Sequence, residues 1–239
     1  MTLDTGSREA SAPQLKVCGI TQLADLHMVQ QVGAAFFGCI VNIPRSPRTI
    51  TPAEATALGR AARIAQVCVI ETDDPTEAAE IARACSPHAL QVHTDAGLEA
   101  IETIRDTVPD SVEVWLAVGL PPRGEQGVDA AESALARIRQ AAAAGISRIV
   151  LDTATRAGTG GTGMVSDWET AARIVKASPL PVMLAGGITP ENVAEAVLAV
   201  GPCGIDVSSG VEHSPGHKDP ARLAHFDIEL NRATAQLGR

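Results

Sequence analysis

Short apolar, β-branched runs alternate with longer alanine-rich runs along almost the whole chain. The short runs have the composition of buried strands, and the longer ones have the apolar spacing of helices. Eight strands are expected, at residues 15–20, 35–41, 65–71, 89–93, 112–118, 147–152, 181–186 and 203–209. Helices are expected near residues 22–32, 52–63, 75–85, 95–106, 129–143, 167–177 and 190–199, and a last one from about residue 219. This alternation predicts an α/β chain folded as a (β/α)8 TIM barrel, with a doubly wound open sheet as the alternative.

No linker or low-complexity insert interrupts the alternation, so we expect a single barrel domain over residues 15–239. Residues 1–14 are polar, which predicts a flexible N-terminal tail and no secretion signal. The chain has 239 residues, an ordinary length for one barrel, and 45% of them are apolar. That content is enough for a sizeable core.

Four expected helices begin with the same local signal, an oxygen-bearing side chain directly before a proline. The side chain can accept a hydrogen bond from an unpaired backbone N–H of the first turn. Proline is tolerated at the first helical position because a backbone N–H there would have no partner within the helix. The pairs are Thr51 and Pro52, Asp74 and Pro75, Thr189 and Pro190, and Asp219 and Pro220.

The charge and the cysteines narrow the range of partners. A net charge of −9 disfavours binding to nucleic acid or to a membrane surface, and no apolar run reaches the ~20 residues of a membrane span. The five cysteines are widely spaced and form no CxxC pair, so neither a zinc site nor a redox pair is expected. Free thiols fit a cytoplasmic protein, and we expect no metal and no cofactor.

The segment KVCGIT, residues 16–21, is the first candidate for chemistry. Its strand ends at Cys18 and breaks at Gly19, which would place the thiol at the mouth of the barrel. The thiol could act as a base if a cation or a helix N-terminus lowered its pKa from the reference value of ~8.5. Lys16 should point to the same side of the strand as Cys18. A buried core thiol is the alternative.

Asp152 ends the sixth expected strand, in the segment IVLDT. Among apolar strand ends its pKa would rise, and a protonated carboxyl group could then donate a proton. A helix cap or an ion-pair partner is the alternative reading of this residue.

Three glycine- or serine-rich segments follow the last three strands and could bind a phosphate group. They are the loop at residues 158–163, the pair Gly186 and Gly187, and the run from Ser208 to Gly210. Barrels often bind phosphate in the loops after strands seven and eight, where backbone N–H groups point at the ligand. A glycine-rich loop alone can be a mere connection.

Three further residues are candidates for substrate contacts. Arg48 lies in the loop after the second strand and could pair with a substrate carboxylate, although a solvated surface arginine is the alternative. Arg45 is a weaker candidate for the same role. His93 ends the fourth strand and is expected to line the pocket.

The order of the motifs KVCGIT, SPR, LQVH, LDT, GGTG, DW, LAGGITPENV and DVSSGVE resembles that of the phosphoribosylanthranilate isomerases of tryptophan biosynthesis. The resemblance extends from Lys16 to Asp219. It implies a (β/α)8 barrel that performs an Amadori rearrangement of N-(5-phosphoribosyl)anthranilate without a cofactor. It also implies a small phosphorylated substrate and a monomer or homodimer.

The resemblance implies a role for each candidate residue. Cys18 would be the general base and Asp152 the general acid, while Arg48 would hold the anthranilate side of the substrate. The residues implied around the phosphate are Gly160, Gly161, Gly163, Gly186, Gly187, Ser208, Ser209 and Gly210.

Two alternatives stay open. One is a sister isomerase that acts on a different N-phosphoribosyl amine in specialised metabolism, because isoleucine and valine replace aromatic residues in the second strand and Thr94 replaces a glycine after the fourth. The other is a non-catalytic barrel that binds a phosphorylated ligand.

Overall fold

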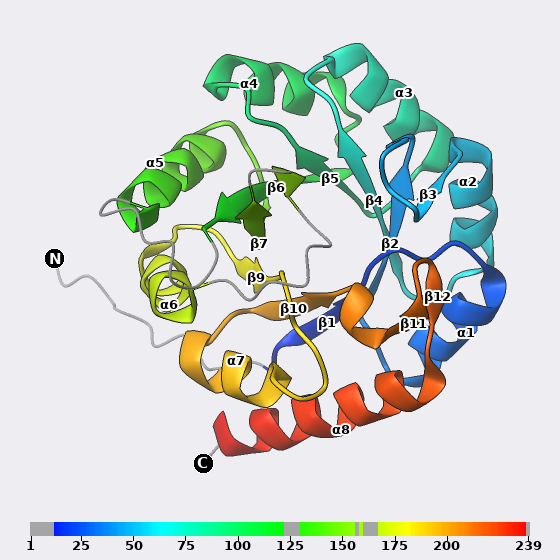
Figure 1. Cartoon of the computed structure of the whole chain (residues 1–239). Coiled ribbons are helices and arrows are strands. Elements are labelled where there is room, and N and C mark those ends of the chain that lie inside the picture. Colours follow the sequence, from blue (N-terminus) through cyan, green and yellow to red (C-terminus); the bar gives the residue numbers. More distant parts are fainter. Residues whose placement is uncertain (1–11, 122–129, 156–157, 160–166, 238–239) are drawn as a thin grey trace, which may run out of the picture.

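Eight parallel strands close into a barrel in the computed structural model, which describes residues 12–121, 130–155, 158–159 and 167–237. The sheet closes because the first strand pairs with both the second and the last one (Figure 1). The barrel strands are β1 (Gln14–Val17), β2 (Phe36–Val41), β4 (Ala65–Glu71), β5 (Ala89–His93), β6 (Glu113–Leu120), β7 (Arg148–Thr155), β9 (Val182–Leu184) and β10 (Gly204–Val207). The predicted barrel is confirmed, and the open sheet is wrong. Most of the expected tail, residues 1–11, lies outside the described part.

Four short strands accompany the barrel strands. β3 (Thr49–Ile50) pairs with β2, and β8 (Gly158–Thr159) pairs with β7. After β10 the chain forms a 3₁₀ turn, η1 (Ser209–Val211), and then a hairpin of β11 (Glu212–Ser214) and β12 (His217–Lys218). This hairpin matters for the site because it lies directly after the last barrel strand.

The helices form a ring around the barrel (Figure 1). They are α1 (Leu23–Gln31), α2 (Pro52–Ala61), α3 (Pro75–Cys85), α4 (Leu98–Thr107), α5 (Ala130–Ala143), α6 (Trp168–Ala177), α7 (Val193–Val200) and α8 (Pro220–Leu237). Within the ranges that the structure describes, no helix is long and apolar enough to cross a membrane.

Three of the four expected helix starts are confirmed. At α2, the Thr51 hydroxyl accepts the Glu54 N–H at 3.3 Å, and the Glu54 carboxylate accepts the Thr51 N–H at 2.8 Å, which completes a capping box. Asp74 and Asp219 likewise accept backbone N–H groups of the first turns of α3 and α8. Each such cap stabilises a helix by about 1 kcal/mol.

The fourth expected start, at Thr189 and Pro190, is wrong, since α7 begins only at Val193. The side chain of Asn192 holds the intervening residues in a turn. Its Oδ1 accepts the Thr189 N–H at 2.8 Å, and its Nδ2 donates to the Gly187 carbonyl at 3.0 Å. The Asn192 side chain therefore fixes the turn after β9, and the capping pattern in the sequence does not reveal this contact.

Two apolar cores fix the position of the site. The larger one lies between the strands and the helices. The smaller one consists of strand residues that alternate with the outward-facing ones, and it fills the inside of the barrel. Its buried members are Phe36, Val67, Ala89, Trp115, Val150, Met183 and Ala185. Further along the strands the inward-facing positions carry Lys16, Gln91 and Asp206, so the carboxyl end of the barrel interior is polar.

Candidate active site

A cavity of about 360 Å³ opens where the barrel strands end. This is the face on which parallel barrels place their reactive residues. Of the residues expected from the sequence, the cavity is lined by Cys18, Arg48, His93, Asp152, Gly186, Gly187, Ser208, Ser209 and Gly210. The expected residues Gly160, Gly161 and Gly163 lie outside the described part of the chain.

Cys18 follows β1 directly and reaches the cavity because the adjacent strand makes room for it. A Cβ atom at Gly38 of β2 would lie 2.7 Å from the Cys18 Sγ atom, so only glycine fits opposite the thiol. Burial raises the pKa of the Cys18 thiol above its usual range, and the neighbouring Lys16 ammonium group only partly opposes this shift. Without a ligand, Cys18 is therefore a neutral thiol at pH 7.

Asp152 lies on β7 with its side chain in the same cavity, and only 9% of the residue is exposed. Burial raises the pKa of its carboxyl group to about 7, and the nearby Asp206 carboxylate adds to the shift. One hydrogen bond, from the Thr153 N–H at 2.7 Å, works in the opposite direction. A carboxyl group with this pKa is well matched to proton donation at neutral pH.

A buried ion pair lies beneath these two groups. The Lys16 Nζ atom is 2.6 Å from the Asp206 Oδ2 atom, and the lysine side chain has no exposed surface. Burial works to lower the pKa of Lys16, but Asp206 and Cys18 outweigh it and raise that pKa, so the lysine stays charged. As expected from the strand alternation, Lys16 is on the side of Cys18, where it favours the thiolate. Asp206, on β10, is not among the residues that the sequence analysis selected.

His93, at the end of β5, lines the cavity as a neutral imidazole. Burial lowers its pKa to about 4, and the positive charges of Lys16 and Arg45 contribute. Its Nε2 atom lies 3.1 Å from the side-chain nitrogen of Gln91. At neutral pH His93 can therefore make polar contacts with a ligand but carries no charge.

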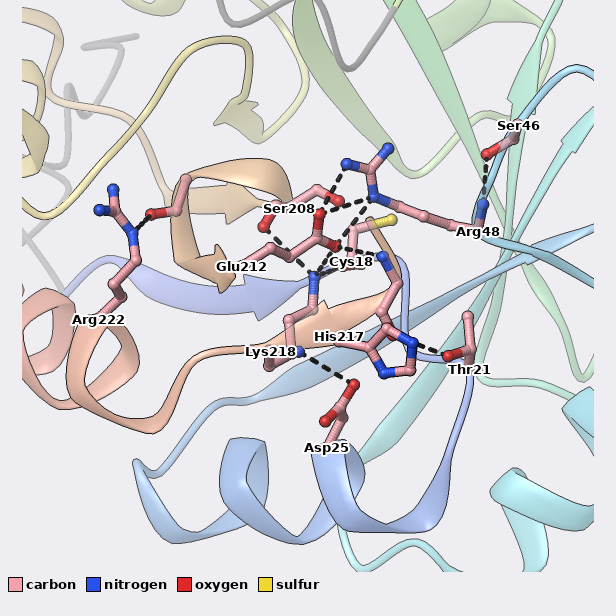
Figure 2. Close-up of polar contacts among 12 residues, drawn as sticks. Cys18, Thr21, Asp25, Ser46, Arg48, Ser208, Glu212, His217, Lys218 and Arg222 are labelled. Carbon is pink, nitrogen blue, oxygen red and sulfur yellow. Dashed lines mark hydrogen bonds and ion pairs between the residues drawn. The ribbon is translucent and has the colours of Figure 1, made fainter. Parts of the chain in front are cut away.

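Arg48 lines the cavity from the loop after β2, but its guanidinium group already has a partner in the protein. Glu212, in the hairpin after β10, accepts hydrogen bonds from Nε at 2.9 Å and from Nη2 at 2.7 Å (Figure 2). Lys218, from the other strand of that hairpin, lies 2.8 Å from the same carboxylate. Burial works to raise the pKa of Glu212, but the two cations hold it below its usual range.

The sequence analysis did not select Glu212 and Lys218. Both stand in the segment GVEHSPGHKD, directly after the last strand, where charged residues can reach the barrel mouth. That position indicates that the two residues can reach the barrel mouth. It does not reveal that Glu212 contacts Arg48, which lies 164 residues earlier in the sequence.

Two turns with little side-chain bulk form another wall of the cavity. Gly186 and Gly187 have φ values of +83° and +64°, which only glycine adopts without strain. A Cβ atom at Gly210 would collide with the Ile188 carbonyl oxygen, so the turns after β9 and β10 touch through their backbones. The Ser208 hydroxyl is buried and makes no hydrogen bond within the described residues. The wall thus offers backbone and hydroxyl groups at close range.

Replacing Gly210 by alanine is expected to separate the two turns, because the added methyl group must displace the Ile188 carbonyl. We expect a loss of about 1–3 kcal/mol in stability. Because the sequence predicts that these turns bind a phosphate group, we also expect a large rise in the dissociation constant of ribose 5-phosphate. Calorimetric titration and urea unfolding measure the two effects. Gly97→Ala is the matched control, because a Cβ atom there meets nothing within 4 Å. Unchanged ribose 5-phosphate binding by Gly210→Ala would contradict this interpretation of the turns.

Among the described residues, no group of three or more histidine, cysteine, aspartate or glutamate side chains is arranged to hold a metal ion. Cys18, Cys39, Cys68 and Cys85 are free thiols, and of the five cysteines only Cys18 lines the cavity. What the cavity offers is a carboxyl group with a raised pKa, a thiol beside an ammonium group, and a wall of backbone groups.

The fold and this cavity define a (β/α)8-barrel enzyme with its reactive groups at the carboxyl ends of the strands. Residues 15–227 match the family model of N-(5′-phosphoribosyl)anthranilate (PRA) isomerase. The chain belongs to this family of aldose–ketose isomerases.

Relatives with this name are similar to the chain over most of its length. It is 39% identical to the N-(5′-phosphoribosyl)anthranilate isomerase of Haloferax volcanii, covering 89% of this chain and 90% of the relative. The phosphoribosyl anthranilate isomerase of Thermotoga maritima superposes with a TM-score of 0.77 at 28% identity, covering 92% of this chain and 99% of that one. Another such isomerase was solved with reduced 1-(o-carboxyphenylamino)-1-deoxyribulose 5-phosphate, and it superposes with a TM-score of 0.74 at 27% identity, with the same coverage.

Proposed function

We propose that the protein converts N-(5-phosphoribosyl)anthranilate into 1-(2-carboxyphenylamino)-1-deoxyribulose 5-phosphate, an Amadori rearrangement in tryptophan biosynthesis. The observation that carries the proposal is that Asp152, with a pKa of about 7, lines the same cavity as the Cys18 thiol and the glycine-rich turns. The family match supports it, as does the reduced product bound to a related isomerase. Because an acid and a base are both present, the geometry favours an isomerase over a barrel that only binds a ligand.

The phosphate group would bind at the turns after β9 and β10. Backbone N–H groups can approach its oxygens closely there, since Gly186, Gly187 and Gly210 carry no side chain. The hydroxyl groups of Ser208 and Ser209 add donors at the same wall. Binding at this rim would place the ribose ring over the centre of the barrel, between Cys18 and Asp152.

Asp152 would start the reaction as the general acid. With a pKa of about 7, roughly half of the carboxyl groups carry a proton at neutral pH. Transfer of that proton to the ribose ring oxygen opens the ring and leaves an iminium ion at C1′. The aspartate then becomes negatively charged close to the Lys16 ammonium group, which stabilises it.

Cys18 would then act as the general base: its thiol proton passes to solvent, and the resulting thiolate removes the proton from C2′. The iminium ion adds a positive charge to those of Lys16 and Lys218, which already favour the thiolate. The thiolate is therefore stabilised most at the step that needs it. Loss of the C2′ proton gives an enolamine, which becomes the 1-deoxyketose on tautomerisation.

The direct test is turnover of synthetic N-(5-phosphoribosyl)anthranilate by the purified protein, measured beside adducts of other arylamines. We expect a kcat within the usual range of enzymes, ~1–10³ s⁻¹, for the anthranilate adduct. Growth of a tryptophan-requiring strain that lacks this isomerase should be restored by the gene. Turnover of another arylamine adduct with no turnover of the anthranilate adduct would show a sister isomerase instead.

A further inference from the structure

Glu212 lies at the centre of a buried charge cluster that the roles of Cys18 and Asp152 do not explain. The Glu212 carboxylate forms an ion pair with Arg48 on one side and with Lys218 on the other (Figure 2). The side chains of Arg48, Glu212 and Lys218 are 11%, 4% and 0% exposed. Burying a carboxylate between two cations restricts all three side chains, so the cluster holds Arg48 in one place.

Lys218 anchors this cluster to the frame of the barrel. Its Nζ atom donates to the Cys18 carbonyl oxygen at 2.6 Å and to the Ser208 carbonyl oxygen at 3.3 Å. Its backbone N–H donates to the Asp25 carboxylate at 3.1 Å, on the side away from Arg48 (Figure 2). Glu212 is therefore fixed relative to the ends of β1 and β10, the two strands that carry the thiol and a phosphate-site turn.

Gly19 leaves space for the aliphatic part of the Arg48 side chain. A Cβ atom at Gly19 would lie 2.6 Å from the Arg48 Cδ atom and 3.0 Å from the Ser208 hydroxyl oxygen. Glu212 occupies Nε and Nη2, while Nη1 makes no hydrogen bond to any residue that the structure describes. A guanidinium held along one edge can still offer another edge to a planar anion.

The charges of the cluster do not cancel. Arg48 and Lys218 contribute two positive charges and Glu212 one negative charge, and of these three residues only Arg48 lines the cavity. The other cations of the cavity are balanced, since Lys16 pairs with Asp206 and Arg45 with Glu71. The guanidinium group of Arg48 is therefore the cation that this cluster presents to an anionic group of a ligand.

We infer that Glu212, held by Lys218, is a positioning residue that aligns Arg48 for the carboxylate of the substrate's aryl group and so makes the cavity select an anionic aglycone. The inference rests on the proposed function for the identity of the aryl group. Glu212 does not touch the substrate and acts through Arg48. Without Glu212, Arg48 would still attract anions but would no longer be held in one orientation. The positive charge of Lys218 would then also lack its carboxylate partner.

The test compares the binding of two unreactive ligands by calorimetry. One is the reduced product analogue with its ortho-carboxylate, and the other is the same molecule with a plain phenyl ring. For Glu212→Gln we expect about a tenfold loss of affinity for the first ligand, the equivalent of one charge-assisted hydrogen bond, and no loss for the second. Ribose 5-phosphate, which lacks the aryl group, should also bind unchanged.

Three further variants separate a positioning role of Glu212 from a role in folding. Glu212→Asp keeps the charge beside Lys218 but shortens the reach to Arg48, so it should show the same selective loss even if Glu212→Gln fails to fold. Glu229→Gln is the matched control, because Glu229 pairs with Arg232 on α8, away from the cavity. In an Arg48→Gln background, Glu212→Gln should cause no additional loss of carboxylate preference.

Equal weakening of both analogues, or of ribose 5-phosphate, by Glu212→Gln would overturn the inference and show a purely structural role. Unchanged preference for the carboxylate ligand would overturn it as well. Both results come from equilibrium binding and do not depend on turnover. Failure of the proposed isomerase activity would instead appear in the turnover assay of the wild-type protein.

Discussion

Replacing Asp152 by asparagine is expected to lower kcat by about 10²–10⁴-fold, the range that one general acid contributes. Asparagine is nearly the same size and can keep a polar contact with the Thr153 N–H, but it has no acidic proton to give to the ribose ring oxygen. Steady-state kinetics with the anthranilate adduct measure the loss. The dissociation constant of the reduced product analogue should change little, because the carboxyl group is needed for chemistry and not for binding.

The same substitution is expected to make the protein more stable above neutral pH. The pKa of Asp152 is raised from 3.8 to about 7 in the folded protein. Between these values the folded chain keeps a proton that the unfolded chain has released, so stability is lost as the pH rises towards the folded pKa. Asparagine avoids this loss. The gain in unfolding free energy of Asp152→Asn over the wild type should therefore grow by about 2 kcal/mol between pH 5 and pH 7, at up to 1.36 kcal/mol per pH unit, and then level off.

Urea unfolding at several pH values measures this difference directly. Asp110→Asn is the matched control, because Asp110 is fully exposed and its variant should show a constant difference from the wild type. An Asp152→Asn advantage that does not change with pH would mean that Asp152 is ionised throughout, and it would remove the argument for a general acid. High activity together with a pH-dependent gain in stability would place the acid elsewhere.

The fold could be predicted from the sequence because its signals are local. Each barrel strand is a short, largely apolar run, and prolines after Thr51, Asp74 and Asp219 mark real helix starts. At Pro190 the same signal failed, since Asn192 binds back to the Gly187 carbonyl and keeps the chain in a turn. The local pattern was present, but a side-chain contact within the turn outweighed it.

The candidate site could be predicted only in part. Strand ends and glycines pointed to residues that do meet in one cavity, because a barrel brings the carboxyl ends of its strands together. The pairing of Arg48 with Glu212, and of Lys16 with Asp206, depends on contacts between residues more than 160 positions apart. Protonation is equally non-local, since burial by many strands sets the pKa of Cys18 and Asp152.

Replacing Cys18 by alanine is expected to lower kcat by about 10²–10⁴-fold as well, because no thiolate remains to take the C2′ proton. Cys18→Ser should be almost as inactive, since a hydroxyl group fills the same space beside Gly38 but ionises far less readily than a thiol. Both variants should bind the reduced product analogue as the wild type does. Cys85→Ala is the control, because Cys85 is also buried but does not line the cavity.

His93 is the competing base, because its neutral imidazole lines the same cavity. Burial lowers its pKa to about 4, which makes it a weak proton acceptor, whereas the raised pKa of Cys18 makes its thiolate a strong one. Proton removal from carbon needs a base that is both strong and deprotonated, and the positive charge of the iminium ion favours the deprotonated form of Cys18. His93→Asn should therefore keep a much larger share of the activity than Cys18→Ala. The reverse order, with an active Cys18→Ala and an inactive His93→Asn, would transfer the role of base to His93.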